Sequence, residues 1–256
     1  MTMAFASVLE LRGVSRKFGG VPAVDGVNLS ARAGTITGLI GPNGAGKTTV
    51  VNMVAGLLRL TEGQVLLDGT DVSRAEAAEL AHAGVARTFQ NIRLVPGATV
   101  LDNILAGFHR HEAAGFWPNV LGLRSARAEA SAFRAEAERL LERFRMTQFA
   151  QHLAGNLSYG HQRRIEMMRA LALRPKLLLL DEPVAGMNDV EAASLGEIFK
   201  EIAADNVAVL LIEHNIRLVS SICSYLYVLS SGRLISEGQP DAVLRDKTVI
   251  EAYLGA

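Results

Sequence analysis

The sequence predicts an α/β fold with a helical region inserted between its strands. Unbroken apolar runs separated by helical stretches are typical of parallel strands that are covered on both faces. Such runs occur at residues 177–180, 207–212 and 225–229. At residues 124–145, apolar residues recur at helical spacing among Arg and Glu residues. This second pattern predicts a helix with one buried face and one solvated face.

The other elements follow from apolar periodicity and from the positions of glycines. Strands are expected at residues 8–11, 27–31, 35–40, 65–67 and 85–89. Residues 46–58 have helical character, and the pattern is again helical from residue 99 to about residue 173. We therefore expect one domain, residues 8–254, in which a helical subdomain of about residues 92–170 interrupts an α/β core.

Composition and charge disfavour several classes of protein. Lys and Arg total 26, as do Asp and Glu, so no global field draws the chain to nucleic acid or to an anionic membrane surface. No apolar run approaches the roughly 20 residues of a membrane-spanning helix. The single cysteine, Cys223, forms no internal disulfide, and no secretion signal opens the sequence. We expect a globular protein of the cytoplasm that binds no nucleic acid.

A glycine-rich segment follows the apolar strand that ends at Ile40 and precedes a helical stretch. It fits the pattern G-x-x-x-x-G-K-S/T with the residues Gly41, Pro42, Asn43, Gly44, Ala45, Gly46, Lys47, Thr48 and Thr49. In this context, glycines let backbone N–H groups converge on a phosphate at the helix N-terminus. We expect Lys47 to neutralise β- and γ-phosphate oxygens and Thr48 to bind Mg²⁺. The alternative, a glycine-rich turn without a ligand, is disfavoured by the matched context.

Two carboxylates, Asp181 and Glu182, follow the apolar strand at residues 177–180. Open α/β sheets place ligand-handling groups at this end of their strands. We expect Asp181 to hold Mg²⁺, through water or beside Thr48, and Glu182 to polarise the attacking water as a general base. An acidic turn after a core strand is the alternative for this pair.

These motifs occur together with three further segments. As a set, they make the chain resemble the ATP-binding subunits of ATP-binding-cassette (ABC) transporters over residues 8–254. The further segments, Arg87-Thr-Phe-Gln90, Leu157-Ser-Tyr-Gly160 and Ile212-Glu-His-Asn215, occur in the family's order. The resemblance implies a P-loop NTPase core of the ABC ATPase type, with an N-terminal antiparallel β subdomain and an inserted helical subdomain. It also implies ATP and Mg²⁺ as ligands.

The resemblance assigns roles to residues whose types alone would not reveal them. Gln90 is expected to contact Mg²⁺ or the attacking water, and His214 to hydrogen-bond the γ-phosphate and orient the catalytic carboxylate. Phe18 is expected to stack on adenine, although a Phe at a strand end more often belongs to a core. Ser158 and Gly160 are expected to complete the nucleotide site of an opposite subunit, so that two ATP molecules lie between two such subunits.

Three residues depart from the family's pattern. Tyr159 replaces the usual first glycine of the signature, and His161 replaces the usual glutamine. Because Gly160 is kept, we expect a working signature. Asn188 stands where Asp is usual at the subunit contact, and it keeps the hydrogen-bonding shape without the charge.

A finer resemblance points to the ATPases of branched-chain amino-acid importers, of the larger-subunit type. It rests on the long helical lobe, on Ala185-Gly-Met-Asn188 and on Glu251-Ala-Tyr-Leu-Gly255. It implies an ATP-hydrolysing motor, peripheral on the cytoplasmic face of the inner (cell) membrane. The implied partners are transmembrane permease subunits, a second ABC ATPase subunit in a heterodimer or a homodimer and, indirectly, a periplasmic or extracellular solute-binding protein.

Several alternatives stay open at this point. Importers of urea or short amides use similar subunits, and lipopolysaccharide exporters share part of the pattern. A soluble ABC ATPase of DNA repair or translation is less favoured, because the chain has no second cassette, coiled coil or metal-binding insertion. A non-hydrolysing regulatory subunit is disfavoured because Glu182 and His214 are both present.

Overall fold

The computed structural model describes residues 7–88, 92–111 and 124–254. Contacts divide the chain into a core unit, Met1–Arg87 with Lys176–Ala256, and a helical unit, Thr88–Pro175. The limits expected from the sequence for the helical subdomain, about 92 and 170, lie a few residues inside these. Within the described residues, no helix combines the length and the apolar character that crossing a membrane requires.

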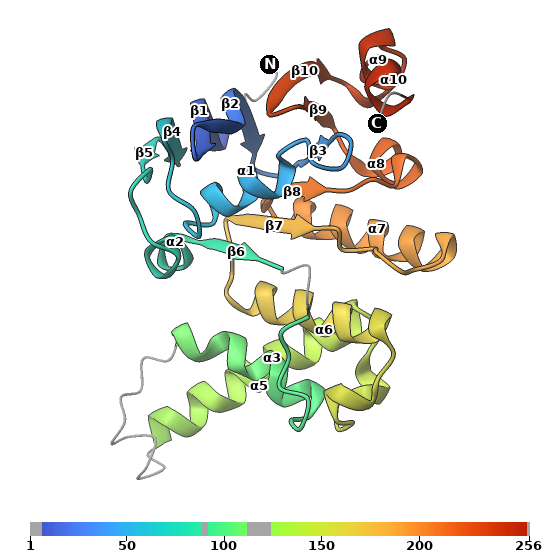
Figure 1. Ribbon diagram of the computed structural model, residues 1–256. Coiled ribbons are helices and arrows are strands. Elements are labelled where there is room, and N and C mark those ends of the chain that lie inside the picture. The colour runs from blue at the N-terminus through green and yellow to red at the C-terminus, as the bar shows by residue number, and fades with distance from the viewer. Residues whose placement is uncertain (1–6, 89–91, 112–123, 255–256) are drawn as a thin grey trace, which may run out of the picture. The chain divides into compact units, whose positions relative to one another are not determined.

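The first sheet of the core unit is antiparallel, as the fold class implied (Figure 1). Its order is β2-β1-β4-β5, with β1 at Ser7–Phe18, β2 at Val21–Arg32, β4 at Glu62–Leu67 and β5 at Thr70–Asp71. Strands β1 and β2 are longer than the apolar alternation predicted, because the register of β1 shifts between Leu11 and Val14. At this shift Gly13 has φ 57°, as the glycine of a β-bulge commonly does. Its N–H donates to Asn28 Oδ1 at 2.9 Å.

The second sheet carries the predicted parallel strands in the order β10-β9-β3-β8-β7-β6. Its strands are β3 (Ile36–Ile40), β6 (Val85–Arg87), β7 (Leu177–Asp181), β8 (Ala208–Ile212), β9 (Tyr225–Ser230) and β10 (Arg233–Gly238). All pair in parallel except β10, which runs antiparallel to β9. The edge strand β10 did not stand out in the sequence because it is only partly buried and mixes charged with apolar residues.

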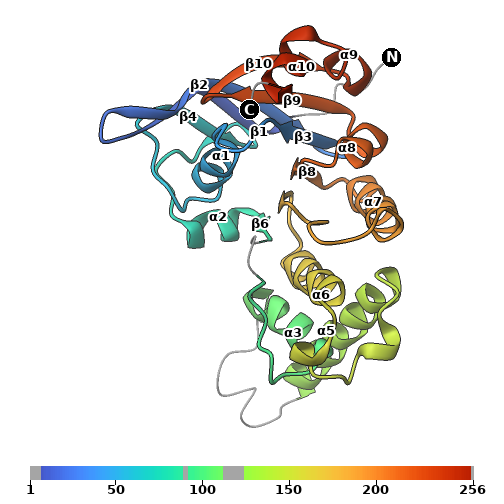
Figure 2. The same ribbon diagram turned by 45° about the vertical axis from the view of Figure 1, so that its right-hand side comes forward.

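Helix α1 (Lys47–Val54) packs between the two sheets, and its apolar residues share one core with both. Leu177 and Leu179 of β7 face this core, whereas Leu178 and Leu180, which are equally buried, face the other way. Helices α7 (Asp189–Ala204) and α8 (Ile216–Ile222) lie on that opposite side, as Figure 2 shows. Covering on both faces is therefore why these strands are unbroken apolar runs.

The remaining helices of the core unit are short. They are α2 (Ala77–Ala83), α9 (Pro240–Val243) and α10 (Lys247–Leu254). Helix α1 ends before the predicted limit of residue 58, because Gly56 adopts φ 67° shortly after its last turn. Left-handed glycines of this kind commonly terminate helices.

Among its described residues, the helical unit packs three main helices around a small core. They are α3 (Val100–Phe108), α5 (Arg124–Arg143) and α6 (Tyr159–Ala172), joined by the short turns η1 (His109–His111), η2 (Thr147–Phe149) and η3 (Ala154–Asn156). Phe108 and Phe133 stack with ring centroids 5.2 Å apart, which joins α3 to α5. A Cβ on Gly107 would lie 2.7 Å from Ala172 Cβ, so α3 and α6 approach closely at this glycine.

Candidate functional site

The loop between β3 and α1 has backbone angles that favour glycine at three positions. Gly41, Gly44 and Gly46 have φ values of 147°, 76° and 101°. A Cβ on Gly41 would collide with the Leu229 backbone, and one on Gly46 would lie 2.5 Å from the Ala23 carbonyl oxygen. A Cβ on Gly44 would meet nothing within 4 Å. Near Gly41 and Gly46 the loop therefore packs tightly against the backbone of Leu229 and Ala23. At Gly44 no neighbouring atoms restrict the space beside the loop.

Lys47, the first residue of α1, reaches back across this loop and is only 8% exposed. Its ammonium donates to the carbonyl oxygens of Gly41 at 2.7 Å and Pro42 at 2.9 Å. Burial lowers the pKa of Lys47, while the charges of Glu182 and Asp181 oppose that shift. An ammonium has three protons, so one remains to bind an anion in the loop.

The other loop residues present polar groups to solvent. Thr48, Asn43 and Gly44 are exposed, and Thr49 and Pro42 are partly buried, whereas Ala45 is buried. Across the described ranges, no hydrogen bond engages the Thr48 hydroxyl, which stands in the first turn of α1. The Thr48 oxygen is therefore available to an external ligand.

Asp181, the last residue of β7, forms a buried ion pair that the sequence did not indicate. Its Oδ2 lies 2.9 Å from Arg87 Nη2, with the two side chains 4% and 9% exposed. Arg87 Nη1 also donates to Asn52 Oδ1 of α1 at 2.6 Å. Arg87 ends the neighbouring strand β6, so the pair depends on sheet order, which no local motif encodes.

Glu182 and His214 follow adjacent strands. Asp181 pairs with Ile212 in the parallel ladder, and the Glu182 N–H donates to the Ile212 carbonyl at 2.9 Å. The loops that carry Glu182 and His214, two of the predicted catalytic residues, therefore begin side by side. Glu182 has φ 48°, which is an uncommon and strained conformation for a non-glycine residue. The His214 side chain is 64% exposed, so its ring is accessible to a ligand.

Phe18 is not part of a core, contrary to the more common role of a Phe at a strand end. It is 48% exposed at the end of β1, and the Arg16 guanidinium lies 4.7 Å from its ring centroid. Exposure of the ring is compatible with stacking on a base, and that role stays a prediction. Gln90 lies outside the described residues, so its role also stays a prediction.

The oxygen donors present fit Mg²⁺. This ion prefers oxygen ligands and usually keeps waters while binding one or two carboxylates and substrate phosphates. Asp181 and Thr48 supply such oxygens, and only one carboxylate oxygen of Asp181 is paired with Arg87. Over the described ranges there is no group of three or more His, Cys, Asp or Glu side chains suited to a metal. A cation here would therefore depend on phosphate and water for most of its ligands.

The predicted signature residues lie at the N-terminus of α6. Ser158 is the N-cap of this helix, and Gly160 lies in its first turn. Ser158 Oγ is 3.1 Å from His161 Nδ1, and the His161 ring lies 4.6 Å from that of Phe149. Because histidine replaces the usual glutamine at position 161, an imidazole nitrogen lies within hydrogen-bond distance of the Ser158 hydroxyl.

The departures at Tyr159 and Asn188 also have structural consequences. The Tyr159 ring lies 5.6 Å from the guanidinium of Arg163, a residue that is itself fully buried. Asn188 is the N-cap of α7 and forms a capping box with Glu191, with bonds of 2.9 and 3.1 Å. Asn is among the best N-caps, so the Asn188 amide oxygen already has a structural role.

Helix α10 lies beside the glycine-rich loop, which the sequence pattern did not predict. The two segments line a polar pocket of about 310 Å³. Its residues are Pro42, Asn43, Gly44, Ala45, Ser230, Ser231, Glu251 and Ala252.

Comparison with known families gives two matches. Residues 24–185 match the ABC transporter family. Residues 233–256 match a family described as branched-chain amino acid ATP-binding cassette transporter. The first match spans the glycine-rich loop, the signature region and the acidic strand end.

The chain is also similar to individual proteins. It is 39% identical over 249 residues to the high-affinity branched-chain amino acid transport ATP-binding protein BraF of Pseudomonas aeruginosa, covering 97% of this chain and 98% of that protein. The identity and coverage are the same for LivG of Escherichia coli K12. Among solved structures, the ADP conformation of MJ1267, an ATP-binding cassette of an ABC transporter, superposes with a TM-score of 0.85 at 33% identity. That match covers 98% of this chain and 99% of MJ1267.

Substitution of Lys47 by Ala tests the phosphate-binding role of the loop. We expect ATP affinity to fall on the order of 10- to 100-fold, because a charged hydrogen bond contributes about 1.5–3 kcal/mol. Titration of the isolated chain with a fluorescent nucleotide measures the change. Lys200→Ala, which removes an exposed lysine that pairs with Glu197 at 2.9 Å, is the matched control. Unchanged affinity in Lys47→Ala would contradict the assignment.

Proposed function

The chain belongs to the ABC transporter family, and from this membership we propose that it is the ATP-hydrolysing motor subunit of an importer for branched-chain or related amino acids. The match of residues 233–256 to the branched-chain amino acid cassette family carries the substrate class. The match of residues 24–185 carries the ATPase. BraF and LivG, which are named for branched-chain amino acid transport, align with this chain over 97% of its length and 98% of their own. This similarity supports the ATPase activity and the substrate class.

Nucleotide binding follows from the loop geometry. The backbone N–H groups around Gly44 and Gly46 bind phosphate oxygens, and the tethered Lys47 ammonium neutralises the β- and γ-phosphates. Thr48, Asp181 and Gln90 would hold Mg²⁺, which when bound neutralises charge on the phosphate oxygens. Phe18 stacks on the adenine ring, since its own ring is exposed.

Glu182 is the general base in this proposal. Its carboxylate accepts a proton from water as the water oxygen attacks the γ-phosphorus and the bond to the β–γ bridging oxygen breaks. His214 donates a hydrogen bond to the γ-phosphate and orients that carboxylate. The bond from Glu182 N–H to Ile212 supports this arrangement, because it ties the base to the strand that precedes His214.

A second cassette subunit completes each site. Ser158, as the exposed N-cap of α6, and Gly160 meet the γ-phosphate bound by the opposite subunit. The second subunit is a sister ATPase in a heterodimer or another copy of this chain. Closure of the pair on ATP and reopening after hydrolysis supply the movement that drives transport.

The membrane partners are permease subunits, with a periplasmic or extracellular solute-binding protein acting through them. The chain acts at the cytoplasmic face of the inner membrane as a peripheral subunit. We place the contact with a permease helix in the segment that follows Gln90 in the sequence, at residues 93–95 of the helical unit, where the Val95 side chain is 57% exposed.

Substitution of Glu182 by Gln tests the general base. We expect steady-state ATP hydrolysis to fall at least ~100-fold, because the amide accepts no proton, while ATP affinity is retained. Phosphate release by the assembled ATPase and nucleotide titration measure the two quantities. Glu197→Gln, an exposed change on α7, should leave both unaltered. Full turnover in Glu182→Gln would show that another group acts as the base.

Co-expression with the permease and ATPase genes of its own genomic neighbourhood tests the motor role. We expect the chain to co-purify with a membrane complex. In proteoliposomes, ATP hydrolysis by that complex should rise when the binding protein is loaded with leucine, isoleucine or valine. A chain that stays entirely outside the membrane fraction in this experiment would refute the role, and stimulation by urea alone would refute the substrate class.

A further inference from the structure

One buried carboxylate joins the two loops that carry Glu182 and His214. Glu213 directly follows β8, and none of its surface is exposed. Its Oε1 accepts the Val184 N–H at 3.1 Å, and Val184 lies two residues after Glu182. Its Oε2 accepts the N–H groups of His214 at 3.1 Å and Asn215 at 3.4 Å. The side chain therefore bridges the loop after β7 to the loop after β8.

The bridge begins where the sheet ladder ends. The last backbone bond between the two segments runs from Glu182 N–H to the Ile212 carbonyl, at 2.9 Å. Beyond it the chains separate into α7 and α8, which begin at Asp189 and Ile216. The segment that begins at Glu182 is thus held at two points. The Ile212 carbonyl binds the Glu182 N–H, and the Glu213 carboxylate binds the N–H of Val184. Both attachments lie within two residues of Glu182, which has a strained φ of 48°.

The chemistry of the bridge requires a carboxylate. All of the groups that it binds are N–H donors, and they approach both of its oxygens. A glutamine in the same volume would turn its NH₂ group toward at least one of these donors. A buried charge is costly, and burial raises the pKa of Glu213 although the N–H bonds oppose that shift. Retaining a glutamate here is therefore unfavourable unless the bridge has a role.

The neighbouring groups leave this link undisturbed. His214 Nδ1 lies 3.9 Å from Glu213 Oε2, and the ring itself projects into solvent. Cys223 is buried nearby, and burial together with the charge of Glu213 raises the pKa of its thiol to about 12. The thiol is thus neutral at physiological pH.

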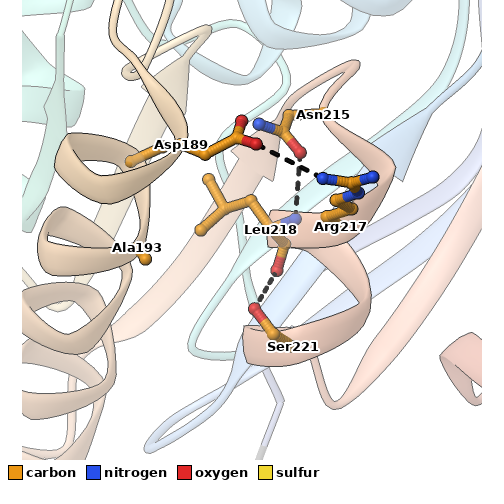
Figure 3. A pocket seen from close by; sticks show the side chains of 7 residues that line it. Asp189, Ala193, Asn215, Arg217, Leu218 and Ser221 are labelled. Atoms are coloured by element: carbon orange, nitrogen blue, oxygen red, sulfur yellow. Dashed lines mark hydrogen bonds and ion pairs between the residues drawn. The ribbon is translucent and has the colours of Figure 1, made fainter.

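A second side-chain link joins the helices α7 and α8 that follow these loops, and unlike the Glu213 bridge it is exposed. Arg217 of α8 extends to Asp189 at the start of α7, with Nη1 and Oδ2 3.3 Å apart (Figure 3). The two side chains are 90% and 78% exposed, so solvent screens this pair and it contributes little. It lies at an open groove of about 280 Å³ between α7 and α8. Of these two side-chain links, the Glu213 bridge is the one protected from water.

We propose that Glu213 is a positioning residue for ATP hydrolysis, which fixes the backbone of the Glu182 loop relative to that of the His214 loop. This inference rests on the proposed function. A general base must lie within hydrogen-bond reach of the water that it activates, and small displacements of reacting groups are costly. Through the bridge, a movement of the His214 loop toward the γ-phosphate also moves Val184 and thereby the segment that follows Glu182.

Glu213→Gln in the assembled ATPase is the test, with Arg217→Gln as the matched control on the exposed link. We expect kcat of Glu213→Gln to fall on the order of 10- to 100-fold, while KM for ATP and nucleotide affinity change little. Arg217→Gln should hydrolyse ATP as the unaltered protein does. A purely structural role would instead lower the unfolding temperature and leave kcat of the folded enzyme unchanged, which would overturn the proposal.

Amide hydrogen exchange on the unaltered protein keeps the proposal testable if the variant does not fold. We expect the amides of Val184, His214 and Asn215 to gain protection together when a non-hydrolysable ATP analogue binds. Protection of the His214 loop without any change at Val184 would contradict the bridge. If the unaltered assembly hydrolyses no ATP, the proposed function fails; if it does and Glu213→Gln matches it, only the role of Glu213 fails.

Discussion

Parallel pairing of β3, β8 and β7 is the constraint on which the rest of the core unit depends. Because these strands run in the same direction, their carboxyl ends meet at one edge of the sheet. The glycine-rich loop leaves that edge after Ile40, the acidic pair after Leu180 and the His214 loop after Ile212. Burial of alternate residues between α1 on one face and α7 and α8 on the other holds the strands in this register.

Three charged side chains at this edge are held in pairs or by backbone groups rather than left to solvent. Lys47 binds two carbonyl groups of its own loop, Asp181 binds Arg87, and Glu213 accepts three N–H groups. Each arrangement limits the movement of a segment that phosphate chemistry would use. Preorganised dipoles and charges of this kind need little rearrangement when charge develops during reaction. These three side chains therefore restrain their segments before any ligand binds.

Much of this edge could be predicted from local sequence, because its motifs coincide with strand ends. The glycine pattern at Gly41 to Lys47 and the acidic pair after β7 are local, as are the apolar runs that define the parallel strands. Arg87 and Glu213 could not be assigned in the same way, since Asp181 lies on the neighbouring strand β7 and Val184 in the loop that follows it, and only the sheet order brings these residues close. The length of β1 was underestimated because the bulge at Gly13 breaks the simple apolar alternation. The edge strand β10 was not predicted because it is only partly buried and also lacks that alternation.

We expect this edge to close on ATP against a second cassette subunit. Measurement of molecular mass in solution tests it most directly, with the Glu182→Gln chain mixed with its candidate sister ATPase or alone, with and without ATP and Mg²⁺. The account predicts a two-cassette particle that forms only with ATP and is lost when Ser158 is changed to Ala. A mass that is the same with and without nucleotide in every mixture would contradict it.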